Sequence, residues 1–107
     1  MPLGNPTKSG VSASGTYTGD NQANRAIPHG LGSIPSMVVI IEPVCGRQYH
    51  IQKTMTVIRY SYPAAGVVGL SDPVTTPDTT NFYVGNSTET TKSANAISSV
   101  YRWVAFP

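Results

Sequence analysis

The sequence has few of the residues that build helices or cross-link a chain. Only three of its 107 residues are leucine, whereas nine are proline and ten are glycine, both of which interrupt helices. The single cysteine, Cys45, excludes a disulfide within the chain. We expect a small, semi-buried thiol there, with a bridge between two chains as the alternative. The scarcity of leucine and the many prolines and glycines exclude a helical bundle.

Charged side chains are also scarce, at 11% of the residues where about 25% is ordinary. The net charge is +2, but the seven lysines and arginines are scattered and no two are adjacent. Because nucleic-acid binding draws on clustered cations, we expect no nucleic-acid partner. The polar residues are mainly Ser, Thr, Asn and Gln, which fits a subunit that hides part of its surface against neighbours.

A long apolar run is missing too. The longest run covers residues 37–41, whereas a membrane span needs about 20 residues. The first residues lack the basic-then-apolar pattern of a signal peptide. We therefore expect no membrane insertion and no secretion through a cleaved leader. Assembly into a particle that is released by lysis is one other way out of a cell.

Val, Ile, Thr and Tyr are plentiful, and these residues favour strands. Turn residues separate them about every ten positions, which predicts an all-β fold. We predict an antiparallel β-sandwich, jelly-roll-like or Ig-like, of about seven or eight short strands. Residues 1–14 show no periodicity and are predicted to form an extended arm, and residues 15–107 the β-sandwich domain. The predicted strands are 15–19, 24–28, 37–41, 48–60 (one long strand or a hairpin), 67–70, 81–85 and 99–106.

The strand at 37–41 is apolar on both faces, so we expect it to be central and covered on both sides. Val38 and Ile40 are predicted core residues, together with Trp103 of the last strand. The polar segment 86–95 is predicted to lie at the surface.

The segment around His29 is predicted to be a loop whose glycines, Gly30 and Gly32, allow positive φ. We expect the His29 imidazole to bond to the backbone and shape the turn. His29, His50 and Cys45 do not show the close ligand spacing of a zinc site. We therefore predict no metal and no cofactor, with a metal held by one histidine per chain on a three-fold axis as the geometric alternative.

Enzymatic chemistry finds little support. The chain has two histidines and no Gly-x-Ser-x-Gly elbow, and all its carboxylates except Glu42 fall in turns or polar loops. We predict that the protein is not an enzyme. A small hydrolase is the third hypothesis, and turnover abolished by His29→Ala or His50→Ala is the observation that supports it.

Tyrosines offer contacts for a partner or a glycan, because each joins a rigid apolar ring to one polar group. Tyr83 faces opposite to Phe82 and Val84 in the predicted strand, and Tyr60 and Tyr62 precede a turn. These three tyrosines are the candidate contact residues, with the 71–80 loop beside them.

Several short motifs together carry a family resemblance. They are Gly15-Thr16-Tyr17-Thr18-Gly19, Asn24-Arg25-Ala26-Ile27-Pro28-His29-Gly30-Leu31-Gly32, Pro35-x-Met37-Val38-Val39-Ile40, Phe82-Tyr83-Val84-Gly85 and Tyr101-Arg102-Trp103-Val104-Ala105-Phe106. From about Gly15 to Phe106 the chain resembles a small all-β domain of bacteriophage and related viral structural proteins, found at tail-fibre ends or attached to capsids. In the family pattern a glycine usually precedes the terminal Tyr-x-Trp, whereas here Val100 stands there. The sequence also shows no shaft or coiled coil, which favours a stand-alone decoration or capping subunit over a complete tail fibre.

The resemblance implies a virion component that self-associates, commonly as a trimer, and it carries over no catalytic residue. We therefore expect a non-enzymatic structural protein of the virion, a capsid or tail decoration or fibre subunit. Its expected partners are copies of itself and other virion proteins, which the arm reaches. The alternative is a glycan- or receptor-binding tip domain that recognises a host-surface glycan.

Overall fold

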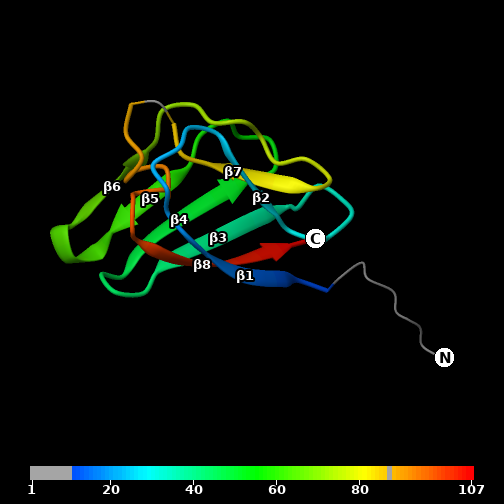
Figure 1. The fold of residues 1–107 in the computed structure, drawn as a ribbon, viewed down its shortest axis with the longest axis horizontal. Coiled ribbons are helices and arrows are strands. Elements are labelled where there is room, and N and C mark those ends of the chain that lie inside the picture. Colours follow the sequence, from blue (N-terminus) through cyan, green and yellow to red (C-terminus); the bar gives the residue numbers. More distant parts are fainter. Residues whose placement is uncertain (1–10, 87) are drawn as a thin grey trace.

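The computed structural model describes residues 11–86 and 88–107, and in them the chain forms the predicted antiparallel β-sandwich (Figure 1). The eight strands are β1 (Ala13–Thr18), β2 (Arg25–Pro28), β3 (Met37–Glu42), β4 (Arg47–Gln52), β5 (Arg59–Tyr62), β6 (Val67–Leu70), β7 (Asn81–Val84) and β8 (Val100–Phe106). The helical element among these residues is a single 3-10 turn, Pro63–Ala65. None of the helices in this part of the chain is long and apolar enough to cross a membrane.

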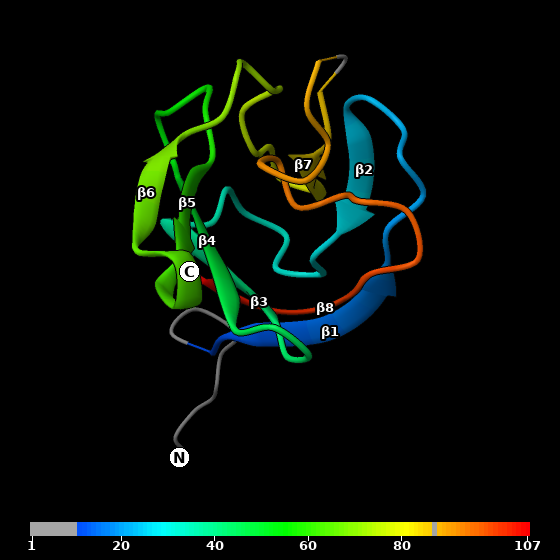
Figure 2. The ribbon, with the colours of Figure 1, turned by 90° about the vertical axis from the view of Figure 1, so that its left-hand side faces the viewer.

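Six strands form one antiparallel sheet in the order β1-β8-β3-β4-β5-β6, and β2 pairs with β7 in a second, smaller sheet. The larger sheet curls around the interior, and β2 and β7 face it from the other side (Figure 2). β3 is therefore central, with β8 and β4 as its neighbours.

Alternation along the strands sends one set of side chains inward. In β8, Tyr101, Trp103 and Ala105 are buried while Arg102 is exposed. The register places Trp103 opposite Ile40 of β3. Across the interior the Trp103 ring meets Phe82 of β7 edge to face, with ring centroids 5.2 Å apart, so this pair joins the two sheets.

Three tyrosines of the larger sheet connect the core to the 86–96 segment. The Tyr17 hydroxyl donates to the Ala94 carbonyl at 2.7 Å, and the Tyr49 hydroxyl donates to the Thr91 carbonyl at 2.9 Å. The Tyr101 hydroxyl accepts the backbone N–H of Ala96 at 2.9 Å. Burial raises the pKa of all three hydroxyls.

The buried core residues are Tyr17, Ile27, Val38, Ile40, Tyr49, Ile51, Ile58, Tyr60, Val74, Phe82, Val84, Ala94, Tyr101, Trp103 and Ala105.

The segment 86–95, predicted to lie at the surface, does so only in part: Thr88, Glu89 and Lys92 are exposed, whereas its last residues are buried. Ser93 and Asn95 are 0% exposed. The Asn95 side chain accepts the Asp20 N–H at 3.2 Å and donates to the Gln22 carbonyl at 2.9 Å. A polar run lies inside here because its side chains satisfy backbone groups that would otherwise be buried without partners.

The structure decides between the two alternatives predicted for 48–60 and moves the boundary of the predicted arm. The stretch predicted at 48–60 is a hairpin, because β4 ends at Gln52 and β5 begins at Arg59. Ile58, just before β5, alternates with exposed Arg59 and is fully buried, with its N–H donating to the Ser71 hydroxyl at 2.9 Å. The last two described positions of the predicted arm, Ala13 and Ser14, belong to β1. Residues 1–10 of that arm lie outside the described residues.

Candidate functional site

The outer face of the six-stranded sheet is the most unusual surface of the molecule. Met37, Val39 and Ile41 of β3 are apolar although they point away from the core. Ile41 is 42% exposed. No described element lies over this face (Figure 2). Within the described residues, the prediction that 37–41 is covered on both sides is therefore wrong for Ile41, while Met37 and Val39 are half-buried. An apolar strand face is usually packed against other residues, and residues 11–86 and 88–107 place none over this face.

Pairing with β8 extends the exposed apolar surface. Val39 lies beside Val104, and Met37 lies beside Phe106, which is 41% exposed. We call Met37, Val39, Ile41, Val104 and Phe106 the outer apolar patch. An exposed apolar surface that gathers in one place, and is not scattered singly, marks an interaction site.

Cations surround the outer apolar patch. Arg102 lies beside Ile41 on β8, and Arg59 lies beside His50 two strands away. Both arginines are exposed on the outer face. None of the five carboxylates of the chain shares this face, since Glu42 points inward and the other four lie in loops. The outer face is therefore both apolar and positively charged.

The loops at the opposite side carry the carboxylates. We call segments 19–24, 71–80 and 88–95 the loop side; they lie across the molecule from the outer face of β8 and β3 (Figure 2). Asp72 and Glu89 are exposed there. Desolvation tends to raise the pKa of Asp20, but hydrogen bonds from Asn95 and Gln22 outweigh it and hold the pKa below its usual value.

The three candidate contact tyrosines lie in different surroundings. Tyr60 is 8% exposed and belongs to the core, which contradicts its prediction as a surface contact. Tyr62 is half-buried beneath the Arg47 guanidinium, whose carbon lies 4.8 Å from the ring centroid. Tyr83 is half-buried, and its hydroxyl donates to Asp78 at 2.6 Å. This hydrogen bond lowers the pKa of Asp78 and raises that of Tyr83. The three residues do not form one platform.

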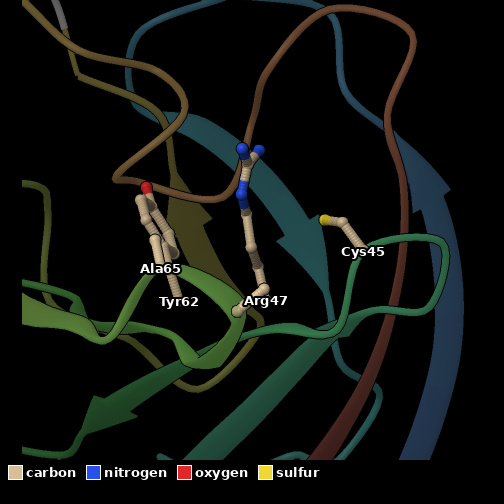
Figure 3. A pocket seen from close by; sticks show the side chains of 5 residues that line it. Cys45, Arg47, Tyr62 and Ala65 are labelled. Carbon is tan, nitrogen blue, oxygen red and sulfur yellow. The ribbon is translucent and has the colours of Figure 1, made fainter.

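A small hollow lies at the β3–β4 turn, and Figure 3 shows the Arg47 side chain between Tyr62 and Cys45. Its volume is about 120 Å³, far below the ~300 Å³ at which pockets for drug-sized ligands begin. Cys45 is exposed and not semi-buried as expected. Its charged neighbour is the cation Arg47, which lies 3.7 Å from Glu42. The hollow brings no base to the thiol.

The two histidines lie apart. His29 is 3% exposed, and its Nδ1 accepts the Leu31 N–H at 3.1 Å, so its Nε2 donates to the Asp78 carbonyl at 2.8 Å. The imidazole thus shapes its loop through the backbone, where Gly30 and Gly32 take φ of 73° and 74°. His50 instead lies on the outer face of the sheet. Within residues 11–86 and 88–107, no three His, Cys, Asp or Glu side chains gather to hold a metal ion.

Comparison with known proteins adds no relative: no family model, no curated protein and no solved structure matches this chain. The candidate site therefore rests on the geometry alone. Sequence reasoning missed Arg102, Val104 and Phe106 as surface residues. Their alternation with Tyr101 and Trp103 in the last strand was the signal that places them opposite the core.

Proposed function

We propose that this protein is a non-enzymatic structural subunit of a virion, of capsid-decoration, tail or fibre type, that associates with copies of itself. The outer apolar patch is the observation that carries the proposal. Within the described residues Ile41 and Phe106 are exposed and Met37, Val39 and Val104 are half-buried, although all five lie on the central strand of the sheet or its neighbour. Covering them removes apolar surface from water, which favours association. The resemblance of the sequence motifs to viral β-domains supports the class of assembly.

The test is the oligomeric state in solution, measured by sedimentation and by light scattering over a range of protein concentrations. We expect the wild-type protein to associate and Ile41→Lys to be a folded monomer. Val44→Lys is the matched control, because Val44 is 91% exposed but lies in the β3–β4 turn, away from the outer apolar patch. A wild-type protein that stays monomeric would overturn the proposal. An equal loss of association in both variants would show general stickiness of apolar surface.

Attachment to the particle is assigned to the N-terminal residues. A segment without its own core is ordered by another surface. Deleting residues 2–10 leaves β1 intact, since β1 begins at Ala13. We expect the truncated protein to keep its oligomeric state and to lose binding to the particle, which cosedimentation with virions measures. Retained cosedimentation would assign attachment to the β-sandwich.

The second candidate function is glycan binding at a fibre tip, and the half-buried Tyr83 favours it. Its ring lies on the side of β7 away from the core, and the bond to Asp78 fixes its hydroxyl. Glycan-array binding that is lost in Tyr83→Ala while the oligomeric state is kept would support this function. The burial of Tyr60 and the stacking of Arg47 on Tyr62 make it the weaker of the two.

A further inference from the structure

The outer apolar patch needs an occupant, and its charge narrows the choice. Residues 1–10 of the same chain contain Lys8 and no carboxylate. The outer face already carries Arg59 and Arg102. Residues 1–10 therefore bring no carboxylate to pair with these arginines, so charge does not favour them as the partner of this face.

The same face of a second copy is equally unsuited. A symmetric contact through the outer face brings Arg59 and Arg102 from both copies into one interface with no carboxylate to pair with them. Cations that are removed from water without a partner oppose association.

The loop side of a second copy has the complementary charge. It carries four carboxylates (Asp20, Asp72, Asp78 and Glu89) and one cation, Lys92, and Arg25 of β2 lies 3.5 Å from Asp20, so the net charge with Arg25 included is −2. The outer face carries Arg59 and Arg102, a net charge of +2. Asp72 and Glu89 are exposed, and neither lies in an ion pair within the described residues.

The loop side also has a hollow, and one exposed apolar side chain follows its last segment. A hollow of about 220 Å³ opens beside Glu89, and its other lining residues are Asn21, Ala23, Asn86, Thr88 and Thr90. Ile97, just beyond this segment, is 67% exposed. An arginine from another copy can enter the hollow beside the Glu89 carboxylate, which forms no ion pair within the described residues.

We propose that copies associate head to tail, with the outer face of one docked on the loop side of the next through Arg102 and Glu89. This inference rests on the proposed self-association and names its two surfaces. Each copy then keeps one free surface of each kind, so the contact repeats. Such a contact closes into a ring when the rotation allows it and otherwise grows into a filament.

Charge reversal tests the pairing. Arg102→Glu places two carboxylates against each other at this contact and lowers the net charge of the outer face from +2 to 0, and Glu89→Lys places two cations against each other and changes the net charge of the loop side from −2 to 0. We expect each variant alone to need about tenfold or more protein for half-association, because like charges across an interface are repulsive. An equimolar mixture of the two is expected to associate like the wild type, since every contact in an alternating chain then joins opposite charges.

Two further variants keep the test decisive. Lys92→Glu makes the loop side more acidic and is expected to strengthen association, the opposite direction from Glu89→Lys. If a reversed variant loses its native circular dichroism, the neutral pair Arg102→Gln and Glu89→Gln replaces it, with weaker association expected in each. Raising the salt concentration is expected to weaken the wild-type assembly through screening.

The outcomes separate this inference from the proposed function. Wild-type association that Ile41→Lys abolishes and Glu89→Lys leaves unchanged would overturn the head-to-tail contact while self-association stands. Two folded, monomeric variants whose mixture stays monomeric would overturn it as well. A wild-type protein that never associates overturns both proposals.

Discussion

The inner and outer faces of β3 carry similar side chains in different surroundings. Val38 and Ile40 on the inner face are 0% exposed, whereas Ile41 on the outer face is 42% exposed. The inner face packs against residues of the same chain, such as Trp103. The difference teaches that an apolar strand face indicates that other residues pack on it. It does not indicate whether those residues belong to the same chain or to another molecule. The chain supplies one cover, and we assign the other to a second copy.

The largest effect expected from this difference is on stability. Ile40→Ala removes a fully buried side chain and leaves a cavity, so we expect the free energy of unfolding to fall by about 2–5 kcal/mol. Ile41→Ala is expected to lower it by less than about 1 kcal/mol. Urea unfolding at protein concentrations low enough to keep the chain monomeric measures both. Equal losses would mean that the outer face is covered within one chain.

The next prediction concerns the polar closure of the interior. Asn95→Ala removes a buried amide that bonds to Asp20 and Gln22, and we expect it to lower the free energy of unfolding by about 2 kcal/mol. Gln22→Ala is the control, because Gln22 contributes its backbone carbonyl to this bond. Thermal unfolding followed by circular dichroism compares them. Similar melting temperatures would show that the loop side is not needed to close the core.

Gly15 and Thr16 allow the same comparison of inner and outer faces on β1. A Cβ added at Gly15 would lie 2.8 Å from the Trp103 indole on the inner face. We expect Gly15→Ala to lower the free energy of unfolding by about 1–3 kcal/mol, since a packed core tolerates added atoms poorly. Thr16→Ala, at the next position on the outer face, is expected to change it by less than about 0.5 kcal/mol. Both are measured by urea unfolding.

The smallest predicted effect is a loss of stability at alkaline pH. Burial raises the pKa of Tyr17, Tyr49 and Tyr101 in the folded protein, while in the unfolded chain each titrates near 10. Unfolding therefore releases protons above pH 10, so the stability present at neutral pH is lost as the pH rises. We expect the free energy of unfolding to be about 1 kcal/mol lower at pH 10 than at pH 8. An unchanged value would show that these hydroxyls already ionise in the folded state.

The sequence predicts the strands well because their period-two pattern is local. Tyr17, Ile27 and Phe82 are inward-facing as their alternation indicates, and the strand at 37–41 is central. Prediction fails where a residue's surroundings are set by distant segments. The Asn95 side chain is buried where it bonds to Asp20, which lies 75 positions earlier in the sequence.

The candidate site was harder to predict than the fold. Neighbours across a sheet depend on strand order, and nothing local indicates that β8 lies beside β3. Arg102 and Ile41 are therefore adjacent for a reason that no short motif contains. The burial of Tyr60 has the same cause, because its ring lies over Gly69 of the neighbouring strand.

The position of β8 sets the order of events during synthesis. Although β8 follows every other strand in the sequence, it lies between β1 and β3. While a ribosome is still making the chain, β1 has no partner in the sheet and the surface formed by Val104 and Phe106 does not yet exist. Such distant pairings form slowly. Under the proposed head-to-tail contact, copies on neighbouring ribosomes would present an incomplete docking surface, and assembly would wait until each chain has inserted β8.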